Sequence, residues 1–217
     1  MAAFDYSTGP TTATDARTGG VSTDMGPEAG GAAPTDMGAE DQPGPEEQTQ
    51  DFESLTQEQI EAASTSLRQV DALRPGVWQQ LDDAERLAVL QDVENRMAEI
   101  QGRPAVAVRV EPMPPGVYGG YARGRGITLS QEHLESNDTR ELLDSIVHEG
   151  RHAYQDCAIQ TPGFVADSEL IESWRGNWDN YLTADEYGQE LYESQPIERD
   201  AWQYAARIAE AVLGTGR

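Results

Sequence analysis

Residues 146–155 read Ile146-Val147-His148-Glu149-Gly150-Arg151-His152-Ala153-Tyr154-Gln155, and this stretch decides which fold and chemistry are expected. His148 and His152 are four positions apart, so on an α-helix both imidazoles project from one face and can bind a single zinc ion. Glu149 then lies near the open coordination position, where it can take a proton from zinc-bound water. Two of the three histidines in the chain fall in this motif. The alternative is a surface helix that carries two unrelated histidines.

The residues around the motif predict a long amphipathic helix. Asn137 or Asp138 can cap this helix, and Asp138 with Glu141 three residues later has the pattern of a helix-capping box. Gly150 costs a helix roughly 1 kcal/mol relative to Ala, which indicates close approach of another backbone. Cys157 is the single cysteine, so no intramolecular disulfide is possible, and it is expected to be a small core residue. The buried stripe is predicted to consist of Leu143, Ile146, Val147, Gly150, Ala153, Tyr154 and Cys157.

Composition divides the 217 residues into an arm and one domain. Residues 1–52 are rich in Gly, Pro and acidic residues and contain no Leu, Ile or Trp, so they cannot bury enough apolar surface to offset the entropy lost on ordering. We expect a disordered acidic arm there and a folded domain over residues 53–217. The arm lacks the basic start and apolar core of a Sec signal peptide. No segment of the chain has the apolar length of a membrane span.

The chain is strongly acidic, with 39 acidic residues against 15 basic ones and a net charge of −24. Nucleic-acid binding is not expected, because phosphate recognition needs clustered basic residues. A charge of this sign keeps a protein dispersed in solution, and it also suits a basic partner.

The rest of the domain is predicted to be mostly helical, with a small sheet. Apolar spacing predicts helices over residues 54–73 and 77–100. A β-branched run predicts a strand over residues 105–110, and the Gly-rich stretch 116–126 has the pattern of a hairpin that turns at Gly119-Gly120. A short strand, residues 127–130, is expected at the edge of the sheet. The expected fold class is therefore α+β, with an edge strand before the motif helix. This order of elements resembles the zincin fold, which implies an edge strand that runs along the active-site cleft and can pair with an extended peptide.

A catalytic zinc ion needs a third protein ligand and an open position. No histidine follows the motif helix, so an acidic residue is expected. A helix predicted over residues 196–213 begins at a proline and places Glu198 in its first turn. Ala201 and Ala205 are small enough for this helix to approach the motif helix closely. Glu198 is thus the predicted ligand and Glu172 the alternative, although the helix dipole alone would also favour an acid at position 198.

Other polar side chains are candidates for supporting roles at the site. Asp200 is expected to orient a zinc-binding histidine from behind. The donor that stabilises the oxyanion is expected among Tyr187, Tyr192 and Tyr204, and the spacing does not select one of them. Aromatic residues between the two motifs either line a substrate cleft or pack in the core: Trp174, Trp178, Tyr181 and Tyr187.

Residues 146–155, taken with Tyr192-Glu193-Ser194-Gln195-Pro196-Ile197-Glu198-Arg199-Asp200-Ala201, resemble gluzincin-type zinc metallopeptidases. The resemblance covers about residues 105–213 and is greatest to the small bacterial enzymes that occur as phage-associated, polymorphic-toxin or injection-system effector domains. It implies a zincin-like fold that holds one Zn²⁺ per chain through His148, His152 and Glu198, with Glu149 as the general base. It also implies hydrolysis of peptide bonds in a protein or peptide substrate.

The resemblance further implies a bacterial protein that is cytoplasmic at synthesis. Such a protein would be exported or injected by a specialised apparatus, with the arm as the address for loading or as a propeptide. The alternative is a catalytically inactive, zincin-like binding or structural protein of a phage or contractile injection particle. The intact motif argues against this alternative, because a scaffold has no need for Glu149.

Overall fold

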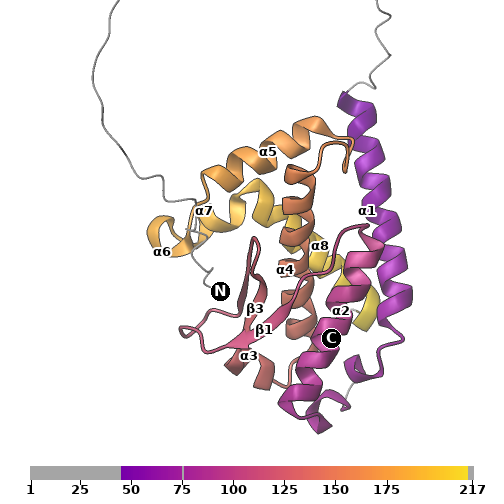
Figure 1. The fold of residues 1–217 in the computed structure, drawn as a ribbon, viewed down its shortest axis with the longest axis vertical. Coiled ribbons are helices and arrows are strands. Elements are labelled where there is room, and N and C mark those ends of the chain that lie inside the picture. The colour runs from indigo at the N-terminus through magenta and orange to yellow at the C-terminus, as the bar shows by residue number, and fades with distance from the viewer. Residues whose placement is uncertain (1–44, 75, 215–217) are drawn as a thin grey trace, which may run out of the picture.

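The computed structural model describes residues 45–74 and 76–214, with side chains from residue 56 onward except that of residue 185. These residues form an α+β fold in which a small sheet packs against helices at one side of a mostly helical domain (Figure 1). Residues 1–44, most of the predicted arm, lie outside the described residues. The elements in chain order are α1 (Pro45–Leu67), the 3-10 helices η1 (Asp71–Leu73) and η2 (Trp78–Gln80), α2 (Asp83–Ile100), β1 (Val108–Glu111), β2 (Gly119–Ala122), β3 (Gly126–Ser130), α3 (Gln131–Glu135), α4 (Thr139–Gln160), α5 (Ser168–Asp179), α6 (Ala184–Tyr187), α7 (Gln189–Ser194) and α8 (Pro196–Leu213).

The motif helix, α4, lies at the centre of the fold. It packs against α8 most extensively, and also against α2, α5 and the sheet (Figure 1). Asp138 caps it as predicted, since its side chain accepts hydrogen bonds from the backbone N–H groups of Arg140 and Glu141. The predicted stripe is buried except for Cys157, which is partly exposed. The prediction of a core cysteine was therefore wrong, because this residue lies at the margin of the helix face that packs.

The first two helices differ from their predicted bounds. α1 begins at Pro45, inside the predicted arm, and ends at Leu67, short of the predicted residue 73. The predicted helix over residues 77–100 begins only at Asp83. The reason is a capping box in which Asp82 accepts from the Glu85 backbone and the Glu85 side chain accepts from the Asp82 backbone.

The sheet has the strand order β1-β3-β2, which corrects two predictions. Residues 127–130 belong to the central strand β3, which pairs parallel to β1 and antiparallel to β2, so the edge strand beside α4 is β2. Gly119 and Gly120 lie within β2, and the hairpin turns after Ala122 instead. A Cβ at Gly119 would lie 2.7 Å from Leu129 Cδ2, so this glycine permits close packing on β3 and does not form a turn.

Two hydrophobic clusters hold these elements together. The larger one joins α1, α2, the sheet, α4 and α8, and the smaller one joins the last turns of α4 to α5 and the start of α8. α4 contributes to both clusters, so its position is fixed from both sides. Among residues 45–74 and 76–214, no helix is long and apolar enough to cross a membrane.

Candidate metal centre

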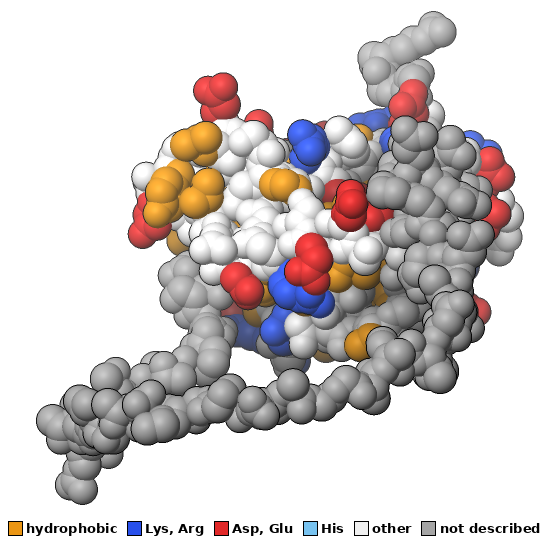
Figure 2. All heavy atoms as spheres, turned by 90° about the horizontal axis from the view of Figure 1, so that it is seen from above, with side chains coloured by type: hydrophobic (Ala, Val, Ile, Leu, Met, Phe, Trp, Pro, Cys, Tyr) orange, Lys and Arg blue, Asp and Glu red, His pale blue; other side chains and the backbone are white. Residues whose placement is uncertain are grey.

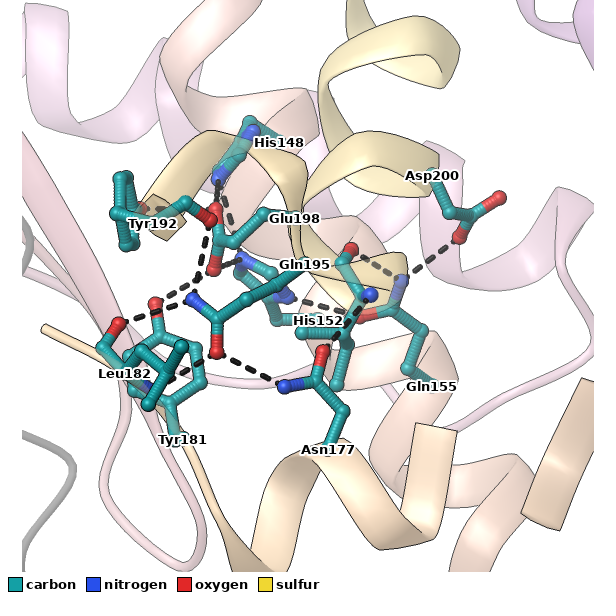
Figure 3. A network of polar contacts seen from close by, with 11 residues as sticks. His148, His152, Gln155, Asn177, Tyr181, Leu182, Tyr192, Gln195, Glu198 and Asp200 are labelled. Carbon is teal, nitrogen blue, oxygen red and sulfur yellow. Dashed lines mark hydrogen bonds and ion pairs between the residues drawn. The ribbon is translucent and has the colours of Figure 1, made fainter. Parts of the chain in front are cut away.

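The three side chains that the sequence predicts as metal ligands meet between α4 and α8 (Figure 3). His148 Nε2 lies 3.1 Å from His152 Nε2. Glu198 places Oε2 3.4 Å from His148 Nε2 and Oε1 3.3 Å from His152 Nε2. Tetrahedral ligands at about 2.0–2.1 Å from a zinc ion lie about 3.3–3.4 Å from one another. The donor set and its spacing therefore fit one metal ion with a fourth position that no described ligand fills.

Glu198 reaches the histidines because α8 starts beside them. Pro196 begins the helix, so Glu198 lies in its first turn, where the positive end of the helix dipole stabilises a carboxylate. Ala201 and Ala205 are fully buried and small, and they let α8 lie close against α4. The local features that predict a helix start at residue 196 thus also bring the third ligand into place.

The charges of the three buried ligands compensate one another. Burial by itself raises the pKa of Glu198, but His152 and His148 outweigh burial and hold this pKa well below its usual range. Burial lowers the pKa of His152, but the charge of Glu198 and its hydrogen bond outweigh burial and raise this pKa to about 9. A divalent cation bound between them would take the place of the proton on His152.

Gln155 lies between His152 and Asp200 (Figure 3). The sequence analysis predicted that Asp200 orients a zinc-binding histidine. Gln155 Oε1 lies 2.8 Å from His152 Nδ1, and Gln155 Nε2 donates to Asp200 Oδ2 at 2.7 Å and to Ile197 O at 2.9 Å. Because the amide oxygen can only accept, Nδ1 of His152 carries a proton, and the second proton, on Nε2, is the one that a bound cation would replace. Asp200 thus contacts His152 only through Gln155. The one feature of the sequence that could have identified Gln155 is its position three residues after His152.

Asp200 is held by Arg151, a fully buried side chain that the sequence analysis did not single out. Arg151 donates to Asp200 from Nε at 2.8 Å and from Nη2 at 3.0 Å. Its guanidinium lies over the rings of Tyr154 and Tyr204, at 4.4 Å and 4.3 Å from their centroids. Tyr204, a predicted candidate for the oxyanion donor, is therefore part of the core packing around Arg151.

Two tyrosine hydroxyls hold the carboxylate of Glu198 from the side opposite the histidines. Tyr181 donates to Oε1 at 2.6 Å and Tyr192 donates to Oε2 at 2.8 Å (Figure 3). Burial and the negative charge of Glu198 both raise the pKa of Tyr192, so its hydroxyl stays protonated and donates. Tyr192 was a predicted supporting residue, whereas Tyr181 was predicted only as an aromatic of the cleft or core.

Glu149 is buried against the edge strand β2. A Cβ at Gly119 would lie 3.6 Å from Glu149 Cγ, and the backbone of Tyr121 forms a hydrogen bond with the Glu149 carboxylate. The other carboxylate oxygen, Oε2, has no hydrogen-bond partner among the described residues. Burial raises the pKa of Glu149, while the two histidines oppose this rise. Such a carboxylate is ready to accept a proton from a group that enters the site.

The ring of His148 packs against Trp202, with 4.2 Å between the ring centroids. Trp202 lies four residues after Glu198 on the same face of α8, and this spacing is the sequence signal that could have identified it. His148 Nδ1 and Trp202 Nε1 are both buried without a hydrogen-bond partner in the described part of the chain. A bound water molecule is the usual partner for such buried groups.

Two other sequence candidates lie away from the three ligands. Glu172, the alternative third ligand, is exposed and forms an ion pair with Arg175 on α5. Tyr187, a candidate oxyanion donor, is 50% exposed. The geometry therefore favours Glu198 over Glu172 and leaves Tyr181 and Tyr192 as the tyrosines whose hydroxyls contact a ligand.

Gly150, inside the motif, is approached by a buried ion pair and not by a backbone as predicted. A Cβ at this position would lie 3.1 Å from Glu94 Oε2 and 3.2 Å from Arg103 Nη2. Arg103 binds Glu94 through both guanidinium nitrogens, at 2.7 Å and 2.9 Å, and both side chains are fully buried. This pair fixes α2 against the back of the motif helix.

A small pocket adjoins the centre and is lined by His152, Trp178, Tyr181 and Ile197. Its volume of about 10 Å³ is enough for about one water molecule beside His152. No protein-family model, curated protein or solved structure matches this chain, so its function has to be argued from the site itself.

Proposed function

We propose that this protein is a zincin-like, gluzincin-type metallopeptidase that hydrolyses peptide bonds with one zinc ion held by His148, His152 and Glu198. The ligand set supports a catalytic rather than a structural metal. Structural zinc sites are closed by four protein ligands, whereas catalytic sites have three and keep the fourth position open. Among the described residues, only these three form such a group.

Glu149 is the observation that carries the proposal. A buried carboxylate oxygen without a hydrogen-bond partner is costly for a folded protein, and a purely structural site would have no reason to keep one. Glu149 follows His148 directly in the chain, and its carboxylate interacts electrostatically with His148, His152 and Glu198. This is where a hydrolytic enzyme needs its base.

Zinc bound at this site would supply Lewis-acid chemistry, which polarises a carbonyl group and lowers the pKa of water. In our proposal Glu149 accepts the proton of the attacking water on Oε2 and passes it to the nitrogen of the leaving amine. Gln155 keeps His152 in the tautomer that can bind metal. Tyr181 lines the cavity beside His152, and its hydroxyl could donate to the oxygen that gains charge once it leaves its bond with Glu198.

The edge strand supports a peptide as the substrate. β2 pairs with β3 on one side only, and its other side lies toward α4 and Glu149. An extended peptide can pair with a sheet edge of this kind, but at Tyr121 it would have to replace the backbone bond to Glu149. We therefore assign peptide pairing to β2 and not to the predicted strand 127–130, which lies in the centre of the sheet.

The direct test is Glu149→Gln, which keeps the shape of the side chain and removes its basicity. We expect this variant to retain zinc and to lose hydrolysis of an unfolded protein such as casein by roughly 10²–10⁴-fold. Glu172→Gln is the matched control, because Glu172 is exposed on α5, and it should retain both zinc and hydrolysis. Wild-type rates in Glu149→Gln would exclude this residue as the base, and an inactive wild-type protein that binds zinc would favour a binding scaffold.

A further inference from the structure

The segment between α5 and α8, residues 181–195, forms a cap that is fastened to the metal centre at both ends. Tyr181 and Tyr192 donate to the two oxygens of Glu198, at 2.6 Å and 2.8 Å. Gln195 closes the segment on itself, since its Oε1 accepts from Leu182 N at 2.8 Å and its Nε2 donates to Leu182 O at 2.9 Å. The cap, named here for residues 181–195, is thus positioned by the same carboxylate that would bind the metal (Figure 3).

The middle of the cap exposes apolar side chains. Tyr187 and Leu191 are 50% and 52% exposed, and they are the two large hydrophobic side chains that stand out as exposed among the described residues. They lie on α6 and α7, on either side of Gly188. Figure 2 shows hydrophobic side chains gathered at the edge of the molecule where these two helices lie in Figure 1. Exposed apolar groups that lie together next to a functional site mark an interaction surface.

Acidic residues lie close to these two residues in the sequence. Glu186, Glu190 and Glu193 are exposed, and none of them forms an ion pair within the described part of the chain. The sequence contains no Lys or Arg between Arg175 and Arg199. A partner that covers Tyr187 and Leu191, the apolar pair, therefore comes close to negative charges only. This favours a partner with positive charge.

We propose that the cap is a docking surface for the substrate, and that it selects a protein segment carrying both basic and apolar side chains. The cleavage of that segment rests on the proposed peptidase function, while its docking does not. Charge disfavours two other occupants: a second copy of the chain would bring a like-charged cap, and the chain's own residues 1–44 carry seven acidic residues against one basic residue. The docked segment would lie next to Tyr181 and Tyr192, and so next to the metal ligands.

The test is binding of a short fluorescein-labelled peptide of alternating Leu and Arg to the full chain carrying Glu149→Gln, measured by fluorescence anisotropy. A peptide of alternating Leu and Glu is the control probe. In one variant, Tyr187→Ser and Leu191→Ser remove the apolar pair without changing the charge. We expect this double variant to weaken binding of the Leu-Arg peptide by about tenfold or more, because general attraction to an acidic protein cannot compensate for lost apolar contact.

A second pair of variants separates the cap from the overall charge. Glu186→Gln, Glu190→Gln and Glu193→Gln remove three charges from the cap, whereas Glu58→Gln, Glu61→Gln and Glu99→Gln remove three exposed charges from α1 and α2. We expect the cap set to weaken binding about tenfold and the control set by no more than about twofold. Equal effects of the two sets, no effect of the double serine variant, or equal binding of the Leu-Glu probe would each overturn the proposal.

Cleavage of the same peptide by the wild-type chain tells the two proposals apart. If the peptide binds through the cap and is not hydrolysed even with zinc bound, the docking surface stands and the peptidase function fails. If the peptide is hydrolysed and the cap variants leave KM unchanged, the peptidase function stands and the docking surface fails. Sedimentation of the wild-type chain completes the test: a dimer that Tyr187→Ser and Leu191→Ser dissociate would identify a second copy as the occupant and overturn the proposal.

Discussion

At the scale of single residues, Tyr181 and Tyr192 hold the same carboxylate in different surroundings. Tyr192 is buried, and its hydroxyl supports Glu198 from within the fold. Tyr181 is only partly buried, and it lines the pocket beside His152. When Glu198 binds a metal through one oxygen, the hydroxyl on that oxygen becomes available to another acceptor. In the proposed mechanism, we assign the less buried Tyr181 as the donor to a reacting carbonyl and the buried Tyr192 as the support for Glu198.

The pair Tyr181→Phe and Tyr192→Phe separates these two roles. We expect Tyr181→Phe to lower kcat by roughly 10²-fold, with little change in KM or in zinc content, because the lost hydrogen bond acts when charge develops on the substrate. Tyr192→Phe should instead weaken zinc binding by about tenfold, because it removes a bond that orients a ligand. Steady-state kinetics and chelator competition measure the two effects. The same kinetic defect in both variants would contradict the division of roles.

The raised pKa of His152 gives zinc binding a defined pH dependence. In the metal-free protein His152 is protonated below about pH 9, held so by Glu198, and a zinc ion must displace that proton. We expect one proton to be released on zinc binding at pH 7.5, and the apparent affinity to rise about tenfold per pH unit up to about pH 9 and then to level off. Calorimetry in buffers of different ionisation enthalpy counts the proton. Binding without proton release at pH 7.5 would show that His152 is already neutral.

At the scale of elements, local sequence patterns predicted those helix ends that are set by residues adjacent in the chain. The bounds of α8 follow from Pro196 at its start and Gly214 after its end, and the structure has the helix over the predicted residues. The predicted start of α2 was wrong, although Asp82 and Glu85 have the spacing of a capping box in the sequence. The order of the strands could not be predicted. β1 pairs with β3 although β2 lies between them in the sequence, and a β-branched run does not specify which strand it pairs with. The buried ion pair Glu94–Arg103 behind Gly150 could not be predicted either, because no local pattern shows that these residues contact the motif helix.

Gly150→Ala tests the packing behind the motif helix. Alanine favours a helix by roughly 1 kcal/mol, but its Cβ would press on Glu94 and Arg103, which are held by two hydrogen bonds to each other and cannot move apart cheaply. We expect a net loss of about 1–3 kcal/mol in the free energy of unfolding, measured by chemical denaturation. Gly176→Ala on α5 is the control: a Cβ there meets nothing within 4 Å, so this variant should gain stability. A stabilised Gly150→Ala would mean that the ion pair is free to shift.

At the scale of the whole molecule, the candidate site joins parts of the chain that the sequence shows only as separate patterns. The H-E-x-x-H motif and the helix start at residue 196 were sufficient to predict which three side chains meet in a group that could hold a metal ion, because each depends on local spacing. The contacts that support the ligands, through Gln155, Arg151, Tyr181 and Trp202, depend on how α4, α8 and the cap meet, and no local pattern specifies that. The described helices and sheet serve to bring these parts to one place.

The measurement that tests the central claim most directly is the metal content of the purified protein by elemental mass spectrometry, with His152→Ala and Glu172→Gln measured beside it. We predict about one zinc ion per chain in the wild type and in Glu172→Gln, and none in His152→Ala, which removes one of three ligands. A wild-type protein that holds no zinc even after reconstitution, or a His152→Ala variant that holds as much as the wild type, would contradict the metal centre and the function proposed from it.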